Sequence, residues 1–240
     1  MKKIVVLPTY NEIDNIEKMV TEIRNLKEDF HILIVDDNST DGTAQVADRL
    51  SKQKYPSKVF VLHRQKKEGL GKAYIAGFQW ALNQKYEIIF QMDADFSHLP
   101  SYLPLFLKKI KEGFELVIGS RYLNGISVVN WDLKRLLLSK FASIYVQKIT
   151  KMPVKDPTSG FKCWRGEALR KIHLPSIASS GYGFQIETNY RAWQGGLKII
   201  EVPIIFYERR LGISKMHKKI IWEAFWLVWR LRLFGSKDRK

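Results

Sequence analysis

The chain has 240 residues but only one cysteine, so it cannot form an internal disulfide. Cys163 therefore gives no reason to expect an oxidising compartment, and we expect a buried, reduced thiol. The five histidines lack the spacing of zinc ligands. A nucleophile elbow is also missing, so no pattern in the sequence indicates serine-type hydrolysis.

Long apolar runs are missing as well. Lys2 and Lys3 precede only four apolar residues before Pro8, which is too short for a signal peptide. No stretch approaches the roughly 20 apolar residues that are needed to span a bilayer. We therefore expect a protein without a transmembrane helix, which lies at most on the cytoplasmic face of a membrane.

Acidic residues are too few to balance the basic ones, and the net charge is +16. Half of this charge falls within residues 209–240, which contain ten Lys or Arg against two carboxylates. The same segment contains Trp222, Trp226 and Trp229. A basic stretch that is rich in Trp and Leu is typical of a helix on a membrane surface. The exposed aromatics on a basic sheet that bind nucleic acid are not evident, so we expect no nucleic-acid partner.

Short apolar runs alternate with helical patterns along the first half of the chain. This alternation predicts an α/β fold with a Rossmann-like, mostly parallel sheet flanked by helices. The predicted strands are 4–7, 31–35, 59–62, 87–92, 116–119 and 198–202. The predicted helices are 12–27, 42–54, 71–84, 101–112, 134–149, 184–194 and a C-terminal amphipathic helix at 217–234.

Polar and charged residues follow each predicted strand. Ligands of such sheets bind beyond the carboxyl ends of the strands, so these residues are the candidates for function. They fall in the segments 8–12, 36–39, 63–64, 93–98 and 120–122.

Asp93 and Asp95 form the most informative of these groups. Carboxylates at positions i and i+2 project to one side where a strand ends, and they repel each other unless a cation lies between them. Mg²⁺ or Mn²⁺ prefers oxygen ligands and commonly bridges a diphosphate. The alternative is that both aspartates cap the helix that begins near Pro100.

Asp37 follows the second strand, and we expect it to bind a base or ribose while residues 39–41 cap the next helix. The segment 69–72 lacks the spacing of a P-loop and is interpreted as a structural turn. Arginine side chains grip phosphate through paired hydrogen bonds. Basic residues lie at the ends of the predicted elements or in loops: Arg121, Arg135, Arg209, Arg210 and Lys215. Each of them alone is best explained as a solvated surface charge, but as a set they favour phosphate binding.

The chain resembles the dolichyl-phosphate mannosyltransferases, the polyprenol-monophosphate mannose synthase branch of the family 2 glycosyltransferases. The resemblance covers nearly the whole chain, and the blocks 131–135 and 209–215 are its most specific parts. The other matching blocks are 7–12, 36–39, 69–71, 93–95, 119–122, 158–161 and 183–185.

This resemblance implies a GT-A fold, a divalent metal cofactor (Mg²⁺ or Mn²⁺), GDP-mannose as donor and dolichyl or polyprenyl phosphate as acceptor. It implies a catalytic domain over 1–215 and a membrane-interface helix over 216–240. Small membrane-anchor subunits accompany some relatives. A sister enzyme that uses UDP-glucose on the same lipid is the nearest alternative, and an inert nucleotide-sugar-binding or scaffold protein is a second.

The resemblance also implies roles for individual residues. The nucleotide sugar would be held by Pro8, Tyr10, Glu12, Val35, Asp37, Asp93, Ala94, Asp95, Arg209 and Lys215. The acceptor phosphate would be held by Arg121, Arg135 and Ser139. The metal would be held by Asp93, Asp95 and Ser97, where Ser97 takes a position that some relatives fill with glutamine. The catalytic residues would be Asp95, Arg121 and Arg135.

Overall fold

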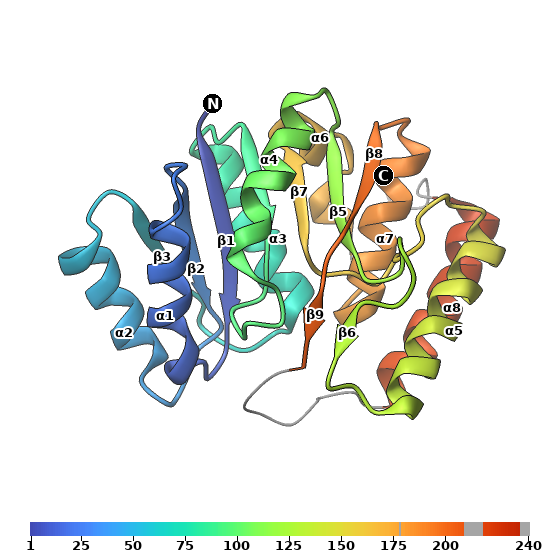
Figure 1. Cartoon of the computed structure of the whole chain (residues 1–240), viewed down its shortest axis with the longest axis horizontal. Coiled ribbons are helices and arrows are strands. Elements are labelled where there is room, and N and C mark those ends of the chain that lie inside the picture. The colour runs from blue at the N-terminus through green and yellow to red at the C-terminus, as the bar shows by residue number, and fades with distance from the viewer. Residues whose placement is uncertain (178, 209–217, 236–240) are drawn as a thin grey trace.

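A seven-stranded sheet runs through the computed structural model, which describes residues 1–177, 179–208 and 218–235 (Figure 1). Its strands are β1 (Lys3–Thr9), β2 (His31–Asp36), β3 (Val59–His63), β4 (Ile88–Gln91), β5 (Leu116–Ser120), β7 (Lys162–Arg165) and β8 (Ile199–Pro203). They are ordered β3-β2-β1-β4-β7-β5-β8. All neighbours are parallel except β7, which is antiparallel to both β4 and β5. The predicted mostly parallel α/β sheet is confirmed.

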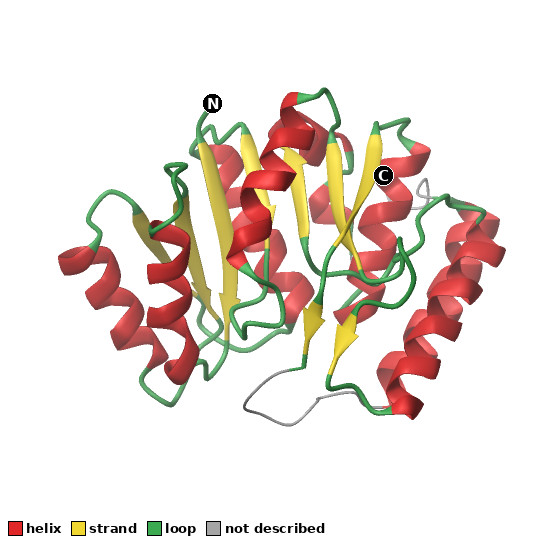
Figure 2. Cartoon of the chain, viewed as in Figure 1, coloured by secondary structure: helices red, strands yellow, loops and turns green. Residues whose placement is uncertain are grey.

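Helices cover both faces of this sheet (Figure 2). One face packs against α1 (Ile13–Arg24), α2 (Thr43–Arg49) and α4 (Leu103–Lys111), and these elements share one hydrophobic cluster. The other face packs against α3 (Leu70–Asn83), α6 (Gly166–Lys171) and α7 (Gly181–Gln194), which share a second cluster. Short helical turns flank three of these helices: η1 (Leu50–Lys54) follows α2, η2 (Pro100–Tyr102) precedes α4 and η3 (Leu174–Ser176) precedes α7.

The central strand β1 explains why the sheet needs two helical layers. Val5 and Leu7 face the α1 side, whereas Ile4 and Val6 face the α3 side, and all four are fully buried. This is the period of two that an extended strand imposes on its side chains. Helix α3 approaches β1 so closely that a Cβ on Gly77 would lie 2.5 Å from Cγ1 of Val6. Only glycine permits that approach.

Strand β7 was not predicted from the sequence. It is four residues long, begins with Lys162 and ends with Arg165, so it shows no apolar run. The Lys162 side chain is fully buried and donates hydrogen bonds to Thr188 Oγ1 at 3.0 Å and to the Gln185 carbonyl at 3.3 Å. Burial lowers the pKa of Lys162 well below its usual value.

A pair of short strands and a pair of helices lie outside the seven-stranded sheet and its helical layers. Strands β6 (Val128–Val129) and β9 (Phe206–Tyr207) form a small parallel pair. Helices α5 (Leu133–Thr150) and α8 (Lys218–Phe234) lie side by side at one end of the molecule (Figure 1). The Tyr145 ring stacks on Phe225 with centroids 5.1 Å apart, and its hydroxyl donates to the Phe225 carbonyl at 3.2 Å. Among the described residues, no helix combines the length and the apolar character that crossing a bilayer requires.

Candidate active site

A cleft of about 520 Å³ opens at the carboxyl ends of the strands. Most of the predicted site residues line it: Pro8, Tyr10, Glu12, Asp37, Asp93, Ala94, Asp95, Ser97, Arg121 and Arg135. Val35 does not, because its side chain is fully buried in the core against α3. Ser139 is also outside the lining and instead accepts a hydrogen bond from the Tyr122 hydroxyl at 2.7 Å. Arg209, Arg210 and Lys215 lie outside the described residues.

One end of the cleft is built around Asp37. The Asp37 amide donates to the Thr9 carbonyl at 2.9 Å, which fixes this carboxylate at the end of β2. Burial raises the pKa of Asp37, while its ion-pair partner Arg64 acts in the opposite direction. Lys67 lies over the Tyr10 ring, with Nζ 3.5 Å from the centroid. A planar aromatic ring beside a buried carboxylate is suited to holding a base or a ribose.

The turn after Asp37 serves the fold. Asp41 accepts hydrogen bonds from the amide and the hydroxyl of Thr43, at 3.0 and 2.6 Å. Gly42, at φ 99°, is the residue that precedes α2. Asp37 lines the cleft as expected, but the prediction that residues 39–41 cap this helix is wrong, because the N-cap is Gly42 and no side chain caps α2.

Asp93 and Asp95 follow β4 and line the centre of the cleft. Asp95 is 5% exposed and accepts a hydrogen bond from the Ser97 amide at 3.0 Å. Asp93 accepts from the Tyr74 hydroxyl at 2.7 Å. Burial and the nearby Asp93 charge raise the pKa of Tyr74 well above its usual value, so the phenol remains a donor. The alternative that these aspartates cap the helix near Pro100 is wrong, since neither η2 nor α4 has a side-chain cap.

The donor set suits a hard divalent cation. Within the described part of the chain, no group of three or more His, Cys, Asp or Glu side chains could hold a metal. Two carboxylates alone fit Mg²⁺ or Mn²⁺, which take their remaining ligands from water and substrate phosphates. The site also leaves room, because a Cβ on Gly160 would lie 3.4 Å from Asp93 Oδ2. The missing side chain of Gly160 thus keeps open the space beside that oxygen.

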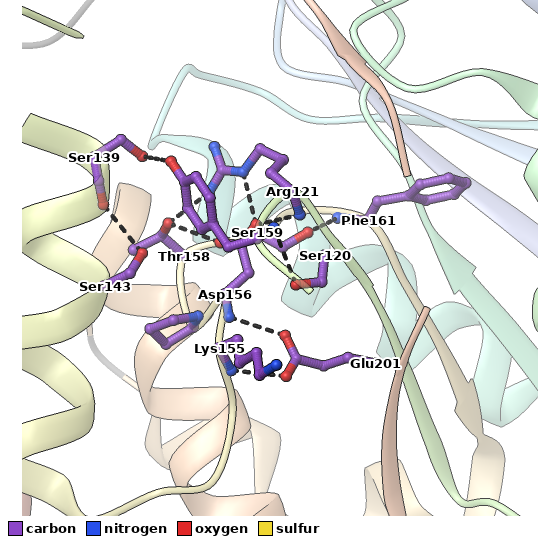
Figure 3. A network of polar contacts seen from close by, with 12 residues as sticks. Ser120, Arg121, Ser139, Ser143, Lys155, Asp156, Thr158, Ser159, Phe161 and Glu201 are labelled. Atoms are coloured by element: carbon purple, nitrogen blue, oxygen red, sulfur yellow. Dashed lines mark hydrogen bonds and ion pairs between the residues drawn. The ribbon is translucent and has the colours of Figure 1, made fainter. Parts of the chain in front are cut away.

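Arg121 also lines the cleft, after β5, and several hydrogen bonds fix its side chain (Figure 3). Its Nε and Nη2 donate to the two carboxylate oxygens of Asp156 at 2.7 and 2.6 Å, and Nη2 also donates to Thr158 Oγ1 at 2.7 Å. Burial works against the charged guanidinium, but the Asp156 carboxylate outweighs this and raises the pKa of Arg121 above its usual value. Arg121 is thus permanently charged.

Arg135 lies near Arg121 because both guanidinium groups pack on one ring. The Trp131 centroid is 4.4 Å from Cζ of Arg135 and 5.5 Å from Cζ of Arg121. Arg135 also donates to Glu208 at 2.6 Å, where Glu208 is 38% exposed. Two cations within one cleft give it the character of an anion site.

One cleft above a mostly parallel sheet thus carries a pair of carboxylates and a pair of arginines. The family model described as glycosyl transferase family 2 matches residues 4–173. The chain belongs to the family 2 glycosyltransferases.

Curated relatives of this glycosyltransferase match over almost its full length. It is 43% identical over 238 residues to the polyprenol monophosphomannose synthase of Mycolicibacterium smegmatis. The aligned region covers 99% of this chain and 89% of that relative. It is 42% identical over 224 residues to the undecaprenyl-phosphate mannosyltransferase of Micrococcus luteus. That aligned region covers 93% of this chain and 91% of the relative.

Solved structures resemble the glycosyltransferase in fold. Glucosyl-3-phosphoglycerate synthase from Mycobacterium tuberculosis, in complex with Mn²⁺, UDP and glucosyl-3-phosphoglycerate, superposes with a TM-score of 0.69. The match covers 96% of this chain and 80% of that one at 20% identity. At this identity the likeness establishes the shared GT-A fold alone.

The sequence did not assign several residues that shape the glycosyltransferase cleft. Arg64 and Glu208 are ion-pair partners of predicted site residues, and Tyr74 bonds to Asp93. Gln185 lies in the matching block 183–185, but the sequence assigns it no role. It is 3% exposed, lines the cleft and accepts from Gln91 at 2.7 Å. The position of Arg64 directly after a strand was the one available signal.

Proposed function

We propose that this glycosyltransferase moves mannose from GDP-mannose to the phosphate of dolichol or another polyprenol. The observation that carries the proposal is a single cleft lined by Asp93 and Asp95 and also by Arg121 and Arg135. Such a cleft can hold a metal-bound diphosphate and a second, separate phosphate. The names of the two relatives at 43% and 42% identity, which specify mannose and a polyprenol, support the same acceptor and sugar.

The donor would occupy the side of the cleft that Asp37 lines. The Asp37 carboxylate can accept hydrogen bonds from the base or the ribose, while Tyr10 offers a flat apolar contact. Val35 has a buried side chain, so only its backbone would reach the donor. Pro8, Glu12 and Ala94 line the same cleft. We assign Arg209 and Lys215 to the donor phosphates on the family resemblance alone.

Asp93 and Asp95, with the Ser97 hydroxyl beside them, would hold Mg²⁺ or Mn²⁺. When bound, the ion neutralises the charge that develops on the departing nucleoside diphosphate. The carboxylates are already oriented for this role by the Tyr74 hydroxyl and the Ser97 amide.

The acceptor phosphate would bind between Arg121, Arg135 and Ser139. It is anionic at neutral pH and needs no strong general base, unlike a sugar hydroxyl. The residues therefore act mainly by positioning the phosphate and stabilising charge. A single in-line displacement inverts the anomeric centre, so the expected product is a β-linked polyprenyl mannosyl phosphate.

Helices α5 and α8 would rest on the cytoplasmic face of the membrane that holds the acceptor. Both expose large apolar side chains, among them Phe141 at 66% and Trp226 at 64%. Exposed cations accompany them: Lys134, Lys148, Arg230 and Arg232. Apolar side chains edged by cations suit an anionic bilayer surface.

On this proposal residues 1–215 form the catalytic domain and residues 216–240 form the interface helix. Small membrane-anchor subunits would be further partners.

The proposal is tested by incubating the purified protein with radiolabelled GDP-mannose, Mg²⁺ or Mn²⁺, and undecaprenyl phosphate. Label should pass into butanol only when the lipid phosphate and the metal are both present. UDP-glucose supplied in place of GDP-mannose tests the sister activity. If neither donor labels the lipid, or if the Asp95→Asn protein labels it as fast as the wild type, the proposal is wrong.

A further inference from the structure

Four hydrogen bonds to Asp156 and Thr158 hold Arg121 in place. Its backbone amide and its Nε both donate to Oδ2 of Asp156, at 2.9 and 2.7 Å. Its Nη2 donates to Oδ1 of Asp156 and to Thr158 Oγ1. These bonds use the Nε hydrogen and both Nη2 hydrogens. Among the described residues, Nη1 has no such partner, and Arg121 lines the cleft.

Asp156 is itself fixed from behind (Figure 3). The Asp156 amide donates to Oε1 of Glu201 at 2.9 Å, and the neighbouring Lys155 amide donates to Oε2 at 2.7 Å. Glu201 lies on β8, which pairs with β5, the strand that ends just before Arg121. The side chain of Asp156 is 0% exposed and that of Arg121 is 6% exposed. Both charges are thus shielded from water and anchored to the sheet.

The second arginine of the cleft is held differently. Within the described part of the chain, the Arg135 side chain makes one hydrogen bond, to Glu208, whose side chain is 38% exposed. An ion pair at the surface is weak and can exchange with a ligand anion, whereas a buried bidentate pair keeps its geometry. The two arginines are therefore unequal: one is rigid and charge-compensated, and the other is free to change partner.

We propose that Asp156 is a positioning residue for the acceptor phosphate, acting through Arg121. By holding Nε and Nη2, it directs the two Nη1 hydrogens into the cleft, so that Arg121 orients the phosphate while Arg135 supplies the attracting charge. This inference rests on the proposed function, because it takes a lipid phosphate as the ligand of Arg121. Asp156 touches no reacting atom.

A double-mutant cycle tests the inference, with farnesyl phosphate as a soluble acceptor and GDP-mannose as donor. Asp156→Asn should raise the acceptor KM by about tenfold or more while leaving the donor KM within about twofold, since misplacing a positioning group costs on that scale. Arg121→Gln should do the same. The double variant should be no worse than Arg121→Gln alone, because Asp156 then has nothing to position.

A purely structural role for Asp156 would give a different result. The effects of Asp156→Asn and Arg121→Gln on the acceptor KM would then be independent, and the cycle would show no coupling. Ile23→Ala, a fully buried site in α1, is the control for lost stability alone and should leave the acceptor KM of the folded enzyme unchanged.

Asp156→Asn leaves a buried guanidinium partly unpaired, so this variant can fail to fold. In that case Thr158→Val carries the test, because it removes one bond to Nη2 and keeps the ion pair. It should raise the acceptor KM in the wild-type background and have no effect in Arg121→Gln. An equal effect in both backgrounds would overturn the inference. Absence of transfer by the wild type would instead overturn the proposed function.

Discussion

Gly160 offers a substitution that should separate activity from stability. Its backbone is not in the left-handed region, so an L-residue can adopt the same conformation. A Cβ there would meet Asp93 Oδ2 at 3.4 Å, Gln185 Nε2 at 3.6 Å and His98 Cε1 at 3.8 Å. These are ordinary van der Waals distances, so Gly160→Ala should fold without a clash.

The expected effects of Gly160→Ala on stability and on activity have opposite signs. Replacing glycine by alanine at a compatible position stabilises a protein by about 0.4–1 kcal/mol, because the unfolded chain loses conformational freedom. The added methyl group takes up the open space beside a carboxylate that the proposed metal and diphosphate need. We expect turnover to fall about 100-fold, which corresponds to ~2.7 kcal/mol of lost transition-state stabilisation.

Two measurements on the same preparation check this prediction. Denaturant unfolding should give a free energy equal to or above that of the wild type. Mannose transfer should fall, and the Mn²⁺ concentration needed for half-maximal rate should rise. Binding of GDP without metal is the control and should change little. Wild-type turnover with an unchanged metal requirement would refute the placing of the metal and diphosphate beside Asp93.

Asp95→Ala should abolish transfer while the circular dichroism spectrum and the thermal midpoint stay close to wild type; retained turnover contradicts the metal assignment. Replacing Trp222 and Trp226 by Ser should weaken sedimentation with anionic vesicles by about tenfold, because both rings are mostly exposed apolar surface; equal sedimentation contradicts the interface helix. Lys162 keeps a lowered pKa in the folded state, so the unfolded chain binds its proton more readily. The stability of the wild type relative to Lys162→Met should therefore rise between pH 7 and about pH 10, and parallel pH profiles would contradict this.

The strands that could be predicted from the sequence are those buried on both faces. Residues such as Ile4 to Leu7 are continuous apolar runs because each side chain meets one of the two helical layers. Strand β7 lies between the same two clusters, to which it contributes Cys163 and Trp164. It begins with Lys162, however, whose amino group makes its hydrogen bonds inside the protein. No local pattern signals such a residue, since its partners on α7 are distant in the chain.

The candidate site likewise contains residues that the sequence could place and residues that it could not. Residues that follow a parallel strand, such as Asp37 and Asp95, could be placed at one edge because the sheet topology brings all those positions together. The side chains that bind these residues could not be placed from the sequence. Asp156 received no role from the sequence, although it binds Arg121 from 35 positions away. Sequence spacing alone carries no information on that pairing.

The antiparallel direction of β7 explains how the unpredicted half of the site arises. A parallel strand contributes the residues that follow it to the carboxyl edge of the sheet, whereas an antiparallel strand contributes the residues that precede it. Because β7 is inserted between β4 and β5, the loop that leads into it reaches the cleft between Asp93 and Arg121. That loop places Gly160 beside Asp93, and it places Asp156 and Thr158 beside Arg121. One reversed strand thus links the proposed donor and acceptor halves of the cleft.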